Sequence, residues 1–145
     1  MHFHNPPTES IRQLLAESNT IAVVGLSPKA NRPSYQVAQA MQGFGYRIIP
    51  VRPAVTEVLG ETCYPSLYDI PNPAEIHLVD VFRAPEHVDE IVDACIALQI
   101  PAIWLQDEVI NEAAALRAQE AGITVVMDRC VYRDYIRMGV AEARS

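Results

Sequence analysis

One short stretch of the sequence, VVGLSPKANRPS (Val23 to Ser34), has the residue types of an anion-binding loop. It begins as an apolar run, ends where a helix could begin, and carries Ser27, Lys29 and Arg32 between the two. The backbone N–H groups at a helix start bind phosphate well, and basic side chains beside them add charge-assisted hydrogen bonds. The stretch therefore predicts a phosphate site between a strand and a helix.

Two more arginines directly follow apolar segments that resemble strands. Arg52 follows YRIIPV (46–51), and Arg83 follows EIHLVDVF (75–82). Together with Lys29 and Arg32 they are four of 11 basic residues in a chain of formal net charge −7. If the fold gathers them, they suit a ligand with several negative charges, because guanidinium groups pair with phosphate oxygens. The alternative is that all four are solvated surface charges.

The elements that would position these residues alternate along the chain. Apolar runs predict five strands, at 21–26, 46–51, 75–82, 102–106 and 124–128. Helical periodicity predicts helices over 34–43, 84–98, 108–121 and 131–138. This alternation is typical of a parallel sheet with right-handed crossovers. We therefore expect a Rossmann-like, doubly wound α/β fold of about five strands with helices on both faces, which binds ligands at the carboxyl ends of its strands.

Length and composition narrow the function classes. The 145 residues fit a single domain, 1–145, in which we expect residues 1–9 to form a flexible N-terminus. The net charge of −7 disfavours nucleic acid as a partner, and no apolar run reaches the length of a membrane span. Three cysteines without CxxC spacing indicate reduced thiols and a cytoplasmic location. We expect no metal site, and the size leaves room for a homodimer.

The cofactor is less clear from these residues. The dinucleotide fingerprint GxGxxG is incomplete, because only Gly25 of its three glycines is present. An NAD site also needs an acidic residue at the end of the second strand, where this chain has Arg52. An arginine there fits a phosphate on the ribose, which both NADP and coenzyme A (CoA) carry. The pattern alone does not choose between the two.

The motifs at successive strand ends resemble the free-standing CoA-binding domain family, which is similar to the N-terminal CoA-binding domain of the succinyl-CoA synthetase α-subunit. They are VVGLSPKANRPSYQVA, YRIIPVRP, VDVFRAPE, AIWLQ and VVMDRC, and they cover about residues 10–139. The resemblance implies that CoA or an acyl-CoA binds at the strand carboxyl edge. The cofactor-binding residues that it implies are Gly25, Ser27, Lys29, Arg32, Pro33, Ser34, Arg52, Pro53, Val81, Phe82, Arg83 and Gln106.

The resemblance also assigns parts of the ligand to parts of the edge. The loop from Ser27 to Ser34 should meet the phosphates, and Arg52 with Pro53 should lie beside the adenosine. The stretch 81–83 should line the wall near adenine or ribose, and Gln106 should lie where the pantetheine arm passes. The chain departs from the family pattern at Arg52, where asparagine is common, and at Val131, where proline is common.

No residue pattern predicts catalysis. Cys130 follows the fifth strand and could react with a CoA thiol or hold a passive place at the rim, and the second is the commoner behaviour of a free cysteine. Asp80 and Asp128 could form an acid–base pair, but we prefer a role in binding loops and arginines. The synthetase works through a phosphorylated histidine in a second domain, which this sequence does not contain.

We therefore expect a CoA-binding protein without catalysis of its own. The alternatives are an NADP-binding oxidoreductase-like domain and a non-catalytic interaction subunit of a larger acyl-CoA assembly. Three other side chains are expected to be structural: Cys95 on an apolar helix stripe, Trp104 in a strand, and His77 as a histidine with its hydrogen bonds satisfied.

Overall fold

A five-stranded parallel sheet forms the centre of the protein in the computed structural model, which describes residues 2–144. The strands are β1 (Thr20–Val24), β2 (Arg47–Val51), β5 (Leu78–Val81), β6 (Ala102–Leu105) and β7 (Thr124–Val126). Their order is β2-β1-β5-β6-β7, and every neighbouring pair is parallel. The predicted Rossmann-like α/β fold is thus confirmed. The order reverses direction beside β1, which is where such sheets bind ligands.

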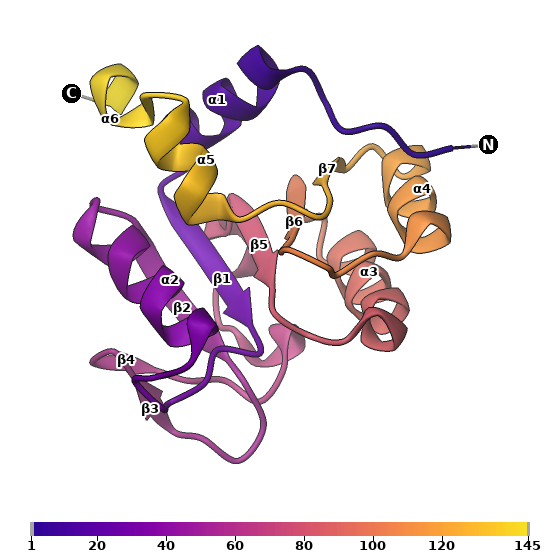
Figure 1. The fold of residues 1–145 in the computed structure, drawn as a ribbon. Coiled ribbons are helices and arrows are strands. Elements are labelled where there is room, and N and C mark those ends of the chain that lie inside the picture. Colours follow the sequence, from indigo (N-terminus) through magenta and orange to yellow (C-terminus); the bar gives the residue numbers. More distant parts are fainter. Residues whose placement is uncertain (1, 145) are drawn as a thin grey trace.

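Helices cover both faces of the sheet (Figure 1). On one face lie α1 (Thr8–Glu17), α2 (Pro33–Gly43), α5 (Val131–Arg137) and α6 (Val140–Arg144), and on the other lie α3 (Val88–Ala97) and α4 (Glu112–Glu120). Each face has its own apolar core. Because successive side chains of a strand point to opposite faces, Leu78 belongs to the α2 side and Val79 to the α3 side.

Two helices begin later than their periodicity predicts. The segment expected to be helical from residue 84 starts as a 3-10 turn at Pro85–His87, and α3 follows it. The segment expected from residue 108 becomes helical at Glu112, because the Asn111 side chain accepts a hydrogen bond from the Ala114 N–H at 3.1 Å and caps the helix there. The last helix, α6, was not predicted.

The proline-rich segment after β2 wraps the outer edge of the sheet. It contains a two-stranded hairpin of β3 (Glu57–Val58) and β4 (Glu61–Thr62), followed by two 3-10 turns, Leu67–Asp69 and Pro73–Glu75. The Tyr64 N–H donates to the Pro50 carbonyl at 3.0 Å, and the Arg52 N–H donates to the Tyr64 carbonyl at 2.9 Å. Pro50 is tolerated inside β2 because β2 is an edge strand. These bonds fix the chain just beyond β2.

The N-terminal segment is packed in the structure, whereas the sequence led us to expect a flexible N-terminus over residues 1–9. Phe3 is only 8% exposed and belongs to the core on the α3 side. The Asn5 amide donates to the Met127 carbonyl at 3.0 Å and accepts from the Met127 N–H at 2.7 Å. Figure 1 shows this segment running from α1 past β7 toward α4. Met1 lies outside the described residues.

Two further observations concern membrane-spanning helices and metal-binding side chains. No helix within residues 2–144 is long and apolar enough to cross a membrane. The same residues contain no cluster of three or more histidine, cysteine, aspartate or glutamate side chains that could hold a metal ion. Cys63, Cys95 and Cys130 are free thiols.

Candidate functional site

A cavity of about 980 Å³ opens at the carboxyl ends of the strands. Its size lies at the upper end of the range for small-molecule sites. Eleven of the twelve predicted cofactor-binding residues line it. They are Gly25, Ser27, Lys29, Arg32, Pro33, Ser34, Arg52, Pro53, Phe82, Arg83 and Gln106. The structure therefore brings residues from four separate strand ends into one place.

Val81 is the exception, and its predicted place in the cavity wall is wrong. Its side chain is 0% exposed and packs in the apolar core on the α3 side of the sheet. Val81 is still inside β5, where side chains alternate between the two faces, whereas Phe82 lies beyond the strand end and is free to line the cavity.

Eight further residues line the cavity that were not among the twelve predicted cofactor-binding residues, although Cys130 was expected at the rim. They are Pro28, Val37, Ala54, Val55, Asp107, Glu108, Val109 and Cys130. Asp107, Glu108 and Cys130 come just after predicted strands, so their position was a usable signal. Ala54 and Val55 lie in the segment that wraps the edge, whose path depends on the long-range bonds to Tyr64 and had no local signal.

The loop between β1 and α2 is held in shape by its own hydroxyl groups. The Ser34 hydroxyl accepts a hydrogen bond from the Ser27 N–H at 3.0 Å, and the Ser27 hydroxyl accepts one from the Lys29 N–H at 3.1 Å. The Arg32 N–H donates to the Lys29 carbonyl at 3.1 Å. Both serines are buried, so they fix the loop while Lys29 and Arg32 remain exposed at its tip.

The start of α2 leaves hydrogen-bond donors available to a ligand. Arg32 is the N-cap residue, but no side chain caps the helix, and Pro33 in the first position has no N–H. The N–H groups of Ser34 and Tyr35 therefore have no acceptor within the described chain. They point from the positive end of an 11-residue helix, which favours a negatively charged group beside the loop.

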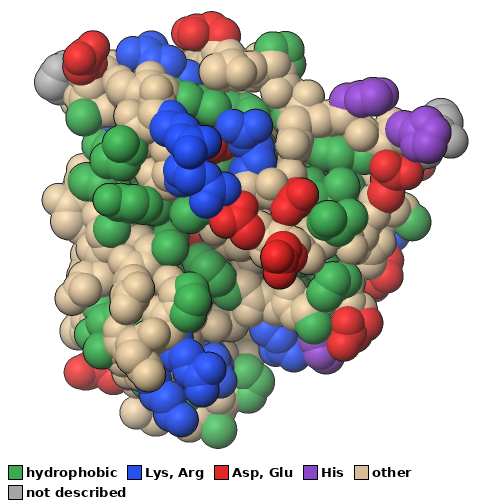
Figure 2. All heavy atoms as spheres, in the orientation of Figure 1, with side chains coloured by type: hydrophobic (Ala, Val, Ile, Leu, Met, Phe, Trp, Pro, Cys, Tyr) green, Lys and Arg blue, Asp and Glu red, His purple; other side chains and the backbone are tan. Residues whose placement is uncertain are grey.

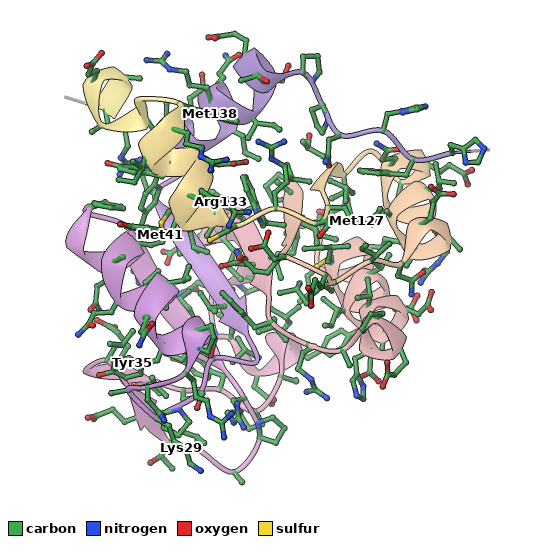
Figure 3. The ribbon with its side chains drawn as sticks, in the orientation of Figure 1. Lys29, Tyr35, Met41, Met127, Arg133 and Met138 are labelled. Atoms are coloured by element: carbon green, nitrogen blue, oxygen red, sulfur yellow. The ribbon has the colours of Figure 1, made fainter. Side chains whose placement is uncertain are left out.

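The basic side chains of the cavity lack acidic partners. Within residues 2–144, no carboxylate lies within 4 Å of Lys29, Arg32, Arg52 or Arg83. Among these residues, the Arg52 side chain donates only to the Gly25 carbonyl, at 3.3 Å. Figure 3 marks Lys29 at the tip of its loop, and Figure 2 shows Lys and Arg side chains grouped at that end of the molecule. The cavity therefore has positive charge that the protein does not neutralise.

Several arginines outside the cavity are paired with carboxylates. Arg47 pairs with Glu75, Arg117 with Asp89 and Asp93, and Arg129 with Asp134. At the far rim of the cavity, Arg133 binds the Asp107 carboxylate through two N–H groups, at 2.7 and 3.0 Å. This pairing holds the pKa of Asp107 below its usual value, so the carboxylate stays ionised and directed to Arg133.

Gly25 allows the ends of β1 and β5 to come close together. Its φ is +87°, and a Cβ atom at this position would lie 2.3 Å from the Phe82 carbonyl oxygen and 3.0 Å from the Arg83 Cδ. Its N–H donates to the Val51 carbonyl of β2 at 2.8 Å. Three strand ends meet at residue 25. Glycine is needed there because the backbone is left-handed and because the neighbouring strand leaves no room for a side chain.

A buried carboxyl group lies beneath the cavity. Asp80 is 1% exposed, and the Gln106 Nε2 donates to its Oδ1 at 2.5 Å. Burial raises the pKa of Asp80 to about 7, although hydrogen bonds from Gln106 and the Val81 backbone partly oppose the increase. Asp80 thus binds an amide and not an arginine, which corrects part of our expectation.

Asp128 is not part of an acid–base pair with Asp80. It is exposed, has a φ of 59°, and accepts a hydrogen bond from the Glu108 N–H at 2.7 Å. Its role in holding a loop is confirmed. Cys130 is half-buried at the cavity rim.

The other chemistry-bearing side chains have the structural roles that we expected. Cys95 is fully buried, and burial raises the pKa of its thiol to about 12. The Trp104 indole N–H donates to the Arg129 carbonyl at 2.7 Å. The His77 Nδ1 accepts hydrogen bonds from the N–H groups of Asn19 and Thr20, at the opposite ends of the strands from the cavity.

Comparison with known proteins agrees with this geometry. The sequence profile of the CoA binding domain matches residues 19–135. The chain belongs to the CoA-binding domain family. The profile spans β1 to α5 and so includes every strand end that lines the cavity.

Relatives of similar length share most of this CoA-binding domain. The "Uncharacterized protein YneT" of Bacillus subtilis is 40% identical over 127 residues, which is 88% of this chain and 93% of that protein. A hypothetical protein from Pyrococcus horikoshii superposes with a TM-score of 0.86 and 37% identity, over 95% of this chain and 99% of that one.

A larger enzyme is also related. Residues of this domain are 30% identical to the acetate–CoA ligase [ADP-forming] II of Archaeoglobus fulgidus over 78 residues, which is 52% of this chain but only 11% of that protein. The resemblance to succinyl-CoA synthetase-like enzymes is thus confirmed for the CoA-binding region.

Replacement of Gly25 by alanine should destabilise the fold more than replacement of Gly122. Both residues have a φ of +87°, so the backbone strain is matched, but a Cβ at Gly122 meets nothing within 4 Å. The contact with the Phe82 carbonyl should lower the free energy of unfolding by a further ~1–3 kcal/mol, the range for overpacking. Urea unfolding of the two variants measures the difference, and equal losses would show that the close approach is not required.

Replacement of Asp80 by asparagine should remove a pH dependence of stability. The pKa of Asp80 is about 7 in the folded state and near its ordinary value of 3.8 in the unfolded chain. The folded state therefore binds more protons between these values, and its stability falls as the pH rises from 4 to 7. Between pH 5 and pH 8, the free energy of unfolding should fall less in Asp80→Asn than in the unaltered protein.

The exposed Glu86 provides a control for this measurement, since Glu86→Gln removes a carboxylate without a buried partner. Urea titrations at the two pH values are compared for all three proteins. An equal decline in Asp80→Asn and the unaltered protein would mean that Asp80 does not titrate in this range.

Proposed function

We propose that the protein binds CoA, or an acyl-CoA, in the cavity at the carboxyl edge of the sheet, and that it has no catalysis of its own. The observation that carries the proposal is the set of basic side chains, Lys29, Arg32, Arg52 and Arg83, that line one cavity without carboxylate partners. CoA has a pyrophosphate and a phosphate on its ribose, which together supply the missing negative charge. Membership of the CoA-binding domain family supports this ligand.

The parts of CoA have natural places along the edge. The pyrophosphate fits beside the loop and the free N–H groups at the start of α2, where Arg32 lies. The ribose phosphate fits between Arg52 and Arg83, which follow β2 and β5, the strands on either side of β1. Phe82 and Pro53 offer apolar surface for the adenine ring. The pantetheine arm would then extend along the strand ends toward Gln106 and Cys130.

Absence of catalysis is supported by the distribution of reactive groups. None of the four histidines lines the cavity, and His77 is occupied with backbone N–H groups at the opposite sheet edge. The half-buried Cys130 lies at the rim, and the cavity lining has no histidine that could serve as its base. A homodimer and a cytoplasmic location remain predictions from the sequence.

Replacement of Arg32 by alanine should weaken CoA binding. Loss of a charge-assisted hydrogen bond to phosphate costs ~1–3 kcal/mol, or roughly a 5- to 150-fold rise in Kd. Arg47→Ala is the matched control, because Arg47 lies at the amino end of β2 and pairs with Glu75 there. Isothermal titration at one salt concentration measures both affinities. An unchanged affinity in Arg32→Ala would exclude Arg32 as a phosphate ligand.

The same titration with CoA, acetyl-CoA, NADP and NAD separates the alternatives. Binding of CoA that NADP cannot displace supports the proposal. Binding of NADP alone would instead favour an oxidoreductase-like domain. If none of the four binds, the cavity does not serve a nucleotide, and an interaction role for this edge becomes the better explanation.

A further inference from the structure

The most distinctive polar group in the cavity is the Gln106 side chain. It is only 4% exposed, yet it lines the cavity, so the little surface that it has faces the ligand space. Its sole side-chain hydrogen bond within the described residues is the one from Nε2 to Asp80. Among those residues, no side-chain nitrogen or oxygen that is buried from water lacks a hydrogen-bond partner. The Gln106 Oε1 has no partner and must therefore be open to the cavity.

Asp80 determines which end of this amide faces the cavity. An ionised carboxylate only accepts hydrogen bonds, so it holds the Nε2 group of Gln106 and turns the Oε1 group away from itself. This hydrogen bond of 2.5 Å joins two buried groups, and it is charge-assisted when Asp80 is ionised. The cavity wall consequently presents a hydrogen-bond acceptor at Gln106, in an edge that is otherwise rich in donors.

A hydrogen-bond acceptor at Gln106 suits the amide groups of CoA and not its phosphates, which are themselves acceptors. Gln106 follows β6, which is two strands from β1, so it lies ~10 Å along the edge from the phosphate loop at ~4.8 Å per strand. The pantetheine arm has two amide groups, whose nitrogens lie about 7 and 12 Å from the nearer phosphorus when the arm is extended with ordinary bond lengths. An amide N–H of the arm can thus reach Gln106.

We propose that Gln106 is a specificity-determining residue, oriented by the positioning residue Asp80, that accepts a hydrogen bond from an amide N–H of the pantetheine arm. This inference rests on the proposed function, since it assumes that the phosphates of CoA bind at the β1–α2 loop. It assigns to Gln106 the recognition of the arm, which distinguishes CoA from nucleotides that carry the same phosphates but no amide.

The arrangement also predicts a pH dependence of CoA binding. Burial raises the pKa of Asp80 to about 7, so Asp80 becomes protonated as the pH falls below that value. The protonated carboxyl group can donate to Oε1, which would turn the amide and present its NH₂ group to the cavity. Affinity for an N–H donor should then fall as the pH decreases.

No charged group competes for control of Asp80. The buried or half-buried titratable side chains from the segments that pack over this face of the sheet include Arg12, Tyr35, Tyr46, Cys63, Arg129, Cys130, Arg133, Asp134, Tyr135 and Arg144. None of them contributes to the shift of the Asp80 pKa, and Arg129 and Asp134 pair with each other at 2.6 Å. At the cavity side, Asp107 is bound by Arg133.

The first test compares CoA with adenosine 3′,5′-bisphosphate, which has phosphates but no pantetheine arm. Isothermal titration at pH 8 is done on the unaltered protein, on Gln106→Met and on Gln119→Met, an exposed glutamine of α4 that serves as control. We expect Gln106→Met to weaken CoA binding by about 3- to 10-fold, the loss of one neutral hydrogen bond, and bisphosphate binding by less than about 2-fold. Gln119→Met should change the affinity for neither ligand.

Equal weakening of both ligands by Gln106→Met would show a merely structural role, and an unchanged affinity for CoA would show that Gln106 makes no contact. Either result overturns the inference while leaving the proposed function intact. If neither ligand binds the unaltered protein, the proposed function fails, and the inference fails with it.

The second test uses pH and does not depend on the Gln106 variant. The CoA affinity of the unaltered protein is divided by that of Asp80→Asn from pH 5.5 to 8.5, so that ionisation of the ligand's own phosphates cancels. We expect the ratio to fall about 3- to 10-fold as the pH decreases through about 7, because asparagine does not titrate. A ratio that stays constant would overturn the role of Asp80.

Discussion

The approach of the Gly25 backbone to the Phe82 carbonyl is the contact on which the site depends. At this point the end of β1 passes the end of β5, and the Gly25 N–H is bound to β2. Any side chain at residue 25 would force these strand ends apart. The chain then turns outward through Ser27 and returns to the sheet at Ser34, whose hydroxyl closes the loop. The position of the loop relative to Arg52 and Arg83 therefore follows from one close backbone contact.

Charge is distributed so that the cavity, and not the protein as a whole, attracts anions. The chain has a formal net charge of −7, and most of its arginines are bound to carboxylates or carbonyl groups of neighbouring elements. Within residues 2–144, the cations of the cavity have no carboxylate partner. Like charges held close together repel each other, and a bound polyanion would remove that repulsion. The unpaired positive charge of the cavity therefore favours the binding of a ligand with several phosphates.

Much of this site could be predicted from the sequence because the fold places all carboxyl strand ends at one edge. Once strands and helices alternate, residues that follow strands are neighbours, whatever their separation along the chain. This logic places Lys29, Arg52, Arg83 and Gln106 at one edge, and all four line the cavity. It failed for Val81 because a shift of one residue in a strand end changes the face to which a side chain points.

The parts that could not be predicted depend on contacts between distant segments. The N-terminal segment is ordered by the bonds of Asn5 to Met127, which are 122 residues apart and leave no local pattern. The path of the segment after β2 is likewise set by Tyr64, which bonds to the outer edge of that strand. Periodicity and capping describe only neighbours in the sequence, so they contain no information on such pairs.

The pairing of Asp80 with Gln106 shows how a buried ionisable group can serve a site although it destabilises the fold. A carboxylate in an apolar core destabilises the fold when ionised, and here no cation compensates it. An apolar residue at this position would make a more stable core but would leave the Gln106 amide free to turn. The carboxylate gives the amide one orientation, because it can accept a hydrogen bond and cannot donate one. Stability is thereby exchanged for a defined acceptor at the cavity wall, and sequence reasoning that treated Asp80 as a partner for arginines could not anticipate it.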